Sequence, residues 1–271
     1  MPDNGANTPR AHERECLLSA EKLEELVRER YERPLPRRFY DDVSVNEADG
    51  GFAVLLDGRP LKTPLKRAFV VPTRALAEAV AAEWRAQEER INPATMPMTG
   101  LSNAAIDKAD ASQPENERAA LQAHVRELVA HDMLCYRAEA AQPGLAERQR
   151  RAWDPLIDWA EDALGARLYL AEGIMPVEQP EQAVNALVRP YEEAAPFTFV
   201  PLFSMATLTR SAVIPLAVMH GRISPEDAWE ASVLEERWNM ELWGEDEQAA
   251  QRMAHRRAEF MAAARFLELV A

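Results

Sequence analysis

The stretch DGGFAVLLDGRPLKTP, at residues 49–64, decides how the first part of this chain folds. An apolar run at residues 52–56 lies between two turn sequences, Asp49-Gly50-Gly51 and Asp57-Gly58. Glycine beside aspartate favours tight turns between antiparallel strands. Upstream, Val43 and Val45 alternate with polar residues, as in a strand with one buried face. The sequence therefore predicts a β-meander that continues through residues 59–63.

A helix and a proline-rich segment follow the meander. Residues 69–71 predict a further short strand, and Thr73 is suited to cap a helix that presents Leu76, Val80 and Trp84 on one face. Pro93 and Pro97 then prevent a helix from continuing through residues 91–100. We place a boundary in this segment, which predicts a β-rich N-terminal domain at residues 37–96.

Helical patterns dominate residues 97–271, which predict a larger α-helical C-terminal domain. The expected fold class is α+β, with a small N-terminal β-meander or barrel-like domain followed by this mostly helical domain. The apolar run at residues 200–220 predicts one buried helix, kinked by Pro215 and capped by Gly221. Further helices are predicted over residues 115–137, from Asp154-Pro155 to Gly165, over residues 180–188, and onward from Ser224-Pro225.

The first 36 residues have a different character. Residues 17–31 place Leu23, Leu26, Val27 and Tyr31 on one helical face, which predicts a docking helix after a flexible N-terminus. The first fifteen residues mix acidic and basic side chains and contain no apolar core of a secretory signal. We therefore expect a cytoplasmic protein.

Composition and charge exclude several classes of protein. The 271 residues include 31 basic and 45 acidic ones, and the resulting net charge of −14 repels nucleic-acid phosphates and anionic lipids. No apolar run approaches the roughly 18 residues that a membrane-spanning helix needs. Cys16 and Cys135 are too few and too far apart for a disulfide framework or a zinc ribbon. We expect a globular protein with no membrane insertion and no nucleic-acid partner.

One helical face raises an enzymatic alternative. His124, Glu127 and His131 share that face and could hold a metal ion. Catalytic metal sites usually draw ligands from several elements, and charged residues at this spacing commonly form a solvated surface. A metal-dependent enzyme therefore stays the second hypothesis, together with an acid/base enzyme that uses Glu241.

Glu241 is a candidate binding residue because its neighbours in helical projection are apolar. It falls beside Ala231, Trp238 and Leu242, which predicts a carboxylate inside an apolar stripe. A buried carboxylate needs a partner, since an unpaired one costs several kcal/mol. That partner is either an arginine of this chain or a group on a binding protein, and both readings stay open. Trp243, which closes this helix beside Gly244, adds an aromatic group suited to protein binding.

These residues and several short motifs together resemble one known family, the ATP synthase assembly chaperones that bind the free α subunit. The resemblance spans about residues 37–267, and the DGGFAVLLDGRPLKTP stretch is its most specific part. The other segments are Arg38-Phe39-Tyr40, Ala82-Glu83-Trp84, Pro97-Met98-Thr99, residues 103–107, Trp153-Asp154-Pro155 and Trp243-Gly244.

The resemblance implies a non-enzymatic assembly factor for the soluble catalytic head of ATP synthase. Such a protein holds the new α subunit and shields the surface that later pairs with β; it needs no nucleotide, cofactor or small-molecule substrate. The family's important acidic position lies in the helix that leads to Trp-Gly. We match it to Glu241, with Glu235 and Glu236 as alternatives, and we expect Trp238 and Trp243 to contact the partner beside it.

Two features depart from the family pattern. Residues 1–36 lie outside the recognised part, and Arg210 stands where a small residue is expected in the buried helix. Mitochondrial members carry import sequences, which the N-terminus here does not resemble. A bacterial cytoplasmic protein is therefore expected, with the mitochondrial matrix as the less favoured alternative.

Overall fold

The computed structural model describes residues 35–112, 117–139, 141–173, 175, 177–244 and 246–271. The docking helix predicted at residues 17–31, and the rest of the predicted flexible N-terminus up to residue 34, lie outside the described residues. Within the described parts of the chain, every helix is too short or too polar to cross a membrane.

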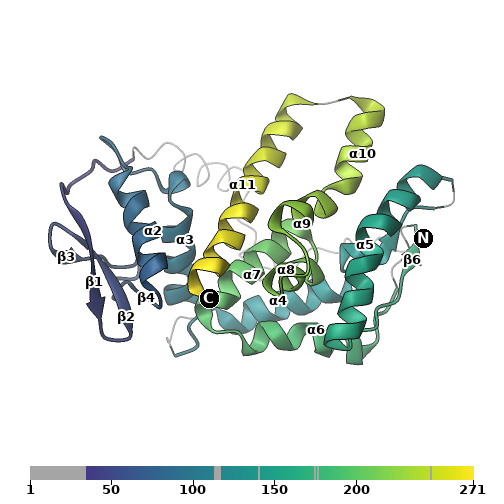
Figure 1. Ribbon diagram of the computed structural model, residues 1–271, viewed down its shortest axis with the longest axis horizontal. Helices are drawn as coiled ribbons and strands as arrows, with labels where there is room; N and C mark the ends of the chain where they lie inside the picture. Colours follow the sequence, from purple (N-terminus) through teal and green to yellow (C-terminus); the bar gives the residue numbers. More distant parts are fainter. Residues whose placement is uncertain (1–34, 113–116, 140, 174, 176, 245) are drawn as a thin grey trace, which may run out of the picture.

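The N-terminal part is a small antiparallel sheet covered by one helix (Figure 1). Strand β2 (Gly51–Leu56) pairs along its whole length with β1 (Val43–Ala48), from Val43 opposite Leu56 to Ala48 opposite Gly51. Its other edge pairs with β3 (Arg59–Pro60) and β4 (Val70–Val71). A Cβ atom on Gly51 would lie 2.2 Å from the carbonyl oxygen of Val71, so β4 can approach only a glycine there. The predicted β-meander is confirmed.

Helix α2 (Arg74–Arg85) packs its apolar face on this sheet, as the spacing of Leu76, Val80 and Trp84 predicts. The Thr73 side chain caps it by accepting a hydrogen bond from the Leu76 N–H. Tyr40 is part of this small core, and its hydroxyl donates a hydrogen bond to the Trp84 carbonyl over 2.7 Å.

The remainder of the chain is mostly helical, and the predicted α+β fold class is confirmed (Figure 1). Two short strands, β5 (Tyr136–Arg137) and β6 (Ala171–Glu172), pair in parallel beside the helices. The helices are α3 (Pro97–Ala104), α4 (Arg118–Ala130), α5 (Pro143–Leu164), α6 (Glu181–Glu193), α7 (Pro196–Thr209), α8 (Val213–Met219), α9 (Pro225–Ser232), α10 (Leu234–Trp243) and α11 (Glu247–Val270). Short 3₁₀ turns occupy Pro93–Thr95 and Met133–Cys135, and a π-helical turn, Ala105–Ala109, continues α3.

Glu83 joins two of the motif segments at the start of α3. Its carboxylate accepts hydrogen bonds from the Met98 N–H over 2.6 Å, the Thr99 N–H over 2.8 Å and the Thr99 hydroxyl over 2.7 Å. Burial raises the pKa of Glu83, and these hydrogen bonds oppose that rise. This carboxylate therefore accepts hydrogen bonds from two backbone amides that have no partner within the helix, and it holds the N-terminus of α3 against α2.

The last helix belongs to two hydrophobic cores. Phe260, Ala263 and Leu267 of α11 lie in the large core of the helical part. Phe266, in the same turn as Leu267, is fully buried in the small core of the N-terminal part. Figure 1 shows the C-terminal half of α11 between α3 and α7. The domain division at residue 96 stays a prediction, because this helix packs on both sides of it.

The predicted start of a helix at Asp154-Pro155 is wrong. Helix α5 begins twelve residues before Pro155, at Pro143, and runs through Pro155 to the predicted end at Gly165, where φ is +71°. A proline inside a helix removes one hydrogen bond. Here Trp153 and Leu156 are buried on either side of Pro155, so packing holds the helix together. Asp154 forms an ion pair with Arg137 over 2.8 Å and does not act as a cap.

The predicted single helix at residues 200–220 is also wrong. The apolar run forms two helices, α7 and α8, and the break lies at Arg210, whose φ is +53°. Pro215 is the third residue of α8, where the missing N–H would have no helical partner, so it causes no kink. Buried Asp132 caps α8 by accepting hydrogen bonds from the Ala212 N–H over 2.8 Å and the Ser211 hydroxyl over 2.9 Å. Gly221 follows α8 with a φ of +64°.

The left-handed backbone at Arg210 explains why a small residue is expected there. A side chain in this conformation costs about 1–2 kcal/mol relative to glycine. We expect Arg210→Gly to raise the free energy of unfolding by about 1 kcal/mol, after the extra chain entropy of glycine is subtracted. Urea denaturation should show a higher midpoint at an unchanged slope. The control Arg222→Gly, at a position with ordinary negative φ, should lower the midpoint. A lower midpoint for Arg210→Gly would contradict the strain argument.

Candidate functional site

Helix α10 and the first turns of α11 form a hairpin that rises above the body, beside the first turns of α5 (Figure 1). We call residues 234–258 the α10–α11 hairpin. Every residue of α10 keeps some solvent exposure, and Gly244, with φ +91°, turns the chain toward α11. Trp238 rests on α5, where a Cβ atom on Gly144 would lie 2.8 Å from its ring. The Arg148 guanidinium lies 4.7 Å from the centre of the same ring.

The tip of the hairpin presents two large apolar side chains to solvent. Trp243 is 85% exposed and Leu242 is 56% exposed. Trp243 is the most exposed large hydrophobic residue in the described parts of the chain. An isolated exposed apolar residue is ordinary, but an adjacent tryptophan and leucine on a projecting helix end form a surface that a partner protein can cover.

Glu241 is not buried, and its predicted place inside an apolar stripe is wrong. Ala231 of that stripe lies in the separate helix α9, and the other members lie in α10, where no residue is buried. The Glu241 carboxylate is more than half exposed and accepts a hydrogen bond from Arg148 Nη1 over 2.8 Å. This hydrogen bond lowers the pKa of Glu241, so the carboxylate is ionised at neutral pH.

The alternative acids on α10 have different neighbours. Glu236 forms an ion pair with Arg256 of α11, with distances of 2.9 and 3.0 Å from Nη2 to the two carboxylate oxygens. Glu235 accepts a hydrogen bond over 2.6 Å from the side-chain amide of Gln149, on α5. Glu235 and Glu241 therefore face α5, whereas Glu236 faces α11. Trp238 is partly covered and Trp243 is open to solvent.

The residues of the enzymatic alternative do not converge. His124 Nδ1 lies 3.4 Å from Glu127 Oε2, but His131 contacts the Tyr136 hydroxyl at 3.3 Å instead. The described residues contain no group of three or more His, Cys, Asp or Glu side chains that could hold a metal ion. This helix face gives the metal-enzyme hypothesis no support.

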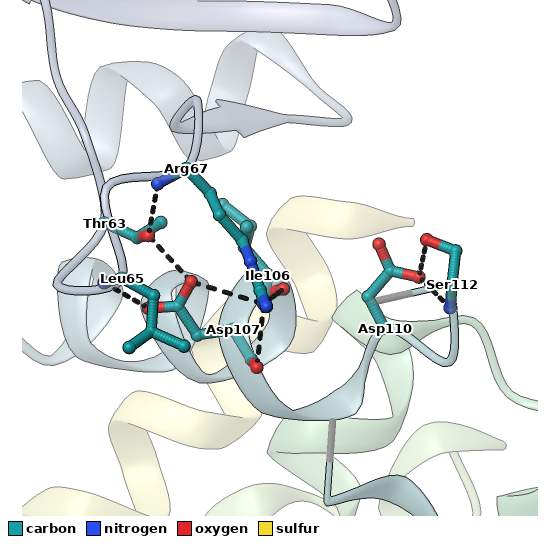
Figure 2. A network of polar contacts seen from close by, with 7 residues as sticks. All are labelled: Thr63, Leu65, Arg67, Ile106, Asp107, Asp110 and Ser112. Carbon is teal, nitrogen blue, oxygen red and sulfur yellow. Dashed lines mark hydrogen bonds and ion pairs between the residues drawn. The ribbon is translucent and has the colours of Figure 1, made fainter. Parts of the chain in front are cut away.

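A buried polar network that the sequence analysis did not single out joins the two parts of the fold (Figure 2). Asp107, in the π-helical turn, accepts hydrogen bonds from the Thr63 hydroxyl over 2.7 Å and the Leu65 N–H over 3.2 Å. Arg67 donates to the carbonyls of Ile106 and Asp107, and its Nη1 lies 3.6 Å from the Asp107 carboxylate. Figure 2 shows the loop that carries Thr63, Leu65 and Arg67 packed on the π-helical turn. Asp110 and Ser112 form a separate local turn. The family motifs LKTP and residues 103–107 thus meet in space.

We expect Asp107→Asn to lower the free energy of unfolding by about 2–3 kcal/mol, because an amide nitrogen would replace one acceptor of this buried network. Thermal or urea unfolding measures the loss. Asp162→Asn, an exposed site on α5, is the matched control and should change stability by less than about 0.5 kcal/mol. Equal stability of Asp107→Asn and the wild type would show that the network does not hold the two parts together.

The comparisons with known proteins agree with this architecture. Residues 37–161 match the family described as ATP12 chaperone protein. The crystal structure of Atp12 from Paracoccus denitrificans is 38% identical, with 87% of this chain and 99% of that chain covered and a TM-score of 0.81. Atu1473 from Agrobacterium tumefaciens is 41% identical, with 89% and 88% covered and a TM-score of 0.80. The mitochondrial protein atp12 of Schizosaccharomyces pombe is 26% identical over 227 residues, 80% of this chain and 78% of that protein.

The small sheet fused to a helical body is the architecture shared with the Atp12 crystal structure, and together with the family match it places the chain in the class of assembly chaperones. The chain belongs to the ATP12 chaperone family, and the resemblance to ATP synthase assembly chaperones is confirmed.

Proposed function

We propose that this protein binds the unassembled α subunit of the soluble catalytic head of ATP synthase and prevents its aggregation before α pairs with β. The observation that carries the proposal is the open tip of the α10–α11 hairpin, where Trp243 is 85% exposed. The contacts belong to Trp243, Trp238, Glu241, Glu235 and Glu236. The protein acts by recognition and not by turnover, without a cofactor, a small-molecule substrate or nucleic acid.

The physical basis is the mutual covering of apolar surface. A subunit that normally buries an intersubunit surface tends to aggregate through it when alone, and a bound chaperone lowers the concentration of that free surface by mass action. Trp243 and Leu242 offer apolar area for such an encounter. The surrounding glutamates favour a basic partner region and disfavour acidic ones.

We place the protein in the bacterial cytoplasm. The two bacterial relatives are 38% and 41% identical to it, whereas the yeast mitochondrial relative is 26% identical. Relatives bearing chaperone names also support a non-enzymatic role. The contact of His131 with Tyr136, and not with the His124–Glu127 pair, supports it further.

Co-purification tests the proposal directly. The tagged protein is expressed with the α subunit alone and, separately, with the assembled catalytic head. We expect capture and solubilisation of free α and no binding to the assembled head. Binding to neither sample would refute the proposal, and equal binding to both would indicate a scaffold instead of a transient chaperone.

We expect Trp243→Ala to weaken capture of α by roughly tenfold to a hundredfold, since a central tryptophan commonly contributes about 2 kcal/mol or more at an interface. Its exposure predicts an unchanged melting temperature. Phe39→Ala is the matched control, because Phe39 is 70% exposed on the N-terminal part. If the two variants capture α equally well, the hairpin tip is not the contact.

Glu241→Lys should weaken capture without unfolding the protein, because the carboxylate is exposed and the new ammonium group repels Arg148. Calorimetry and capture are measured on the same preparation. Glu193→Lys on α6 provides the control, since Glu193 is likewise an exposed glutamate beside an arginine, Arg189. Loss of the folded state in Glu241→Lys would assign Glu241 a structural role.

A further inference from the structure

The three glutamates of α10 differ in how their charge is compensated. Arg148 neutralises Glu241 and Arg256 neutralises Glu236. Glu235 instead accepts a hydrogen bond from Gln149, which carries no charge, and no lysine or arginine of the described residues forms an ion pair with it. The negative charge of Glu235 is therefore available to a cation from outside the chain.

Glu235 lies on a pocket of about 700 Å³ between α10, the start of α5 and the β5–β6 pair. Glu139 and Asn239 add oxygen acceptors to its wall, and Leu145 adds apolar surface. Arg137 is the one basic residue among the described lining residues, and its guanidinium is already paired with Asp154 at 2.8 Å. The pocket thus offers carboxylates and an aliphatic wall, with its own cation neutralised.

Gln149 holds Glu235 in place. Its side chain is fully buried, and its Oε1 accepts a hydrogen bond from the Ala138 N–H over 2.7 Å. Because that backbone group can only donate, the amide oxygen must face it, and Nε2 must then face Glu235 at 2.6 Å. The carboxylate is fixed before any partner arrives, which reduces the entropy lost on binding.

We infer that this pocket receives an arginine side chain from the partner, with its guanidinium on the carboxylates of Glu235 and Glu139 and its aliphatic stem along Leu145. A planar guanidinium suits paired carboxylate oxygens, and its weak hydration suits a partly enclosed site. The pocket is continuous with the α10 surface, so one partner can cover the hairpin tip and fill the pocket together. The identity of that partner as the α subunit rests on the proposed function.

The test compares Glu235 with an exposed glutamate outside the hairpin, Glu193 on α6. Binding of purified α subunit is measured by biolayer interferometry at low and moderate salt, for wild type, Glu235→Gln and the matched control Glu193→Gln. We expect Glu235→Gln to bind at least tenfold more weakly and with a smaller dependence on salt. Glu193→Gln should stay within about twofold of wild type, because Glu193 lies on α6, outside the surface proposed to bind the α subunit, and already has an arginine, Arg189, beside it.

Gln149→Met supplies a second variant that leaves Glu235 in place. It should weaken binding less than Glu235→Gln but more than Glu193→Gln, and circular dichroism reports whether the helical fold is kept. If Gln149→Met is misfolded, the comparison of the two glutamates alone decides. Equal binding by wild type and Glu235→Gln, or equal weakening by both glutamate variants, would overturn the pocket while leaving the proposed function standing. No binding by the wild-type protein would overturn both.

Discussion

The burial of Phe266 on α11 is the contact on which the rest of the structure depends. This side chain completes the small core formed by the sheet and α2, while the next residue, Leu267, lies in the large helical core. A single turn of helix therefore fixes two hydrophobic cores relative to each other. The buried Asp107 carboxylate adds a polar contact between the same two parts, and its three partners Thr63, Leu65 and Arg67 come from one loop.

The same helix carries the proposed binding surface at its other end. With 24 residues α11 is about 36 Å long, so its first turns extend well beyond the cores that hold its last turns. The hairpin itself is held by partly exposed contacts. These include the ion pairs of Glu236 and Glu241 and the packing of the Trp238 ring against Gly144. Exposed ion pairs contribute little to stability. A firmly anchored base and a weakly packed tip together suit adjustment of the tip to the surface of a partner protein.

Local signals in the sequence predicted the elements that depend on nearby residues. The Asp-Gly turns, the Thr73 cap and the Ser224-Pro225 start agree with the structure because each acts within a few residues. At Pro155, tertiary packing keeps a helix intact through a proline that locally favours a helix start. At Arg210, a left-handed backbone conformation divides the apolar stretch into two helices, although no glycine or proline marks that position. The predicted burial of Glu241 was wrong because α10 projects from the body with none of its residues buried, which helical spacing alone does not reveal. Its neighbour Arg148 lies 93 residues away, which no spacing rule reveals.

The hydrogen bond from the Thr73 hydroxyl to the Leu269 carbonyl joins residues 196 positions apart. During synthesis at about 5–20 residues per second, the sheet and α2 would wait roughly 10–40 s for the helix that closes their core. Until then the apolar face that Phe266 covers is open to water and to other nascent chains. A chaperone built in this order is itself, for part of every synthesis, an incomplete chain with an unprotected apolar surface.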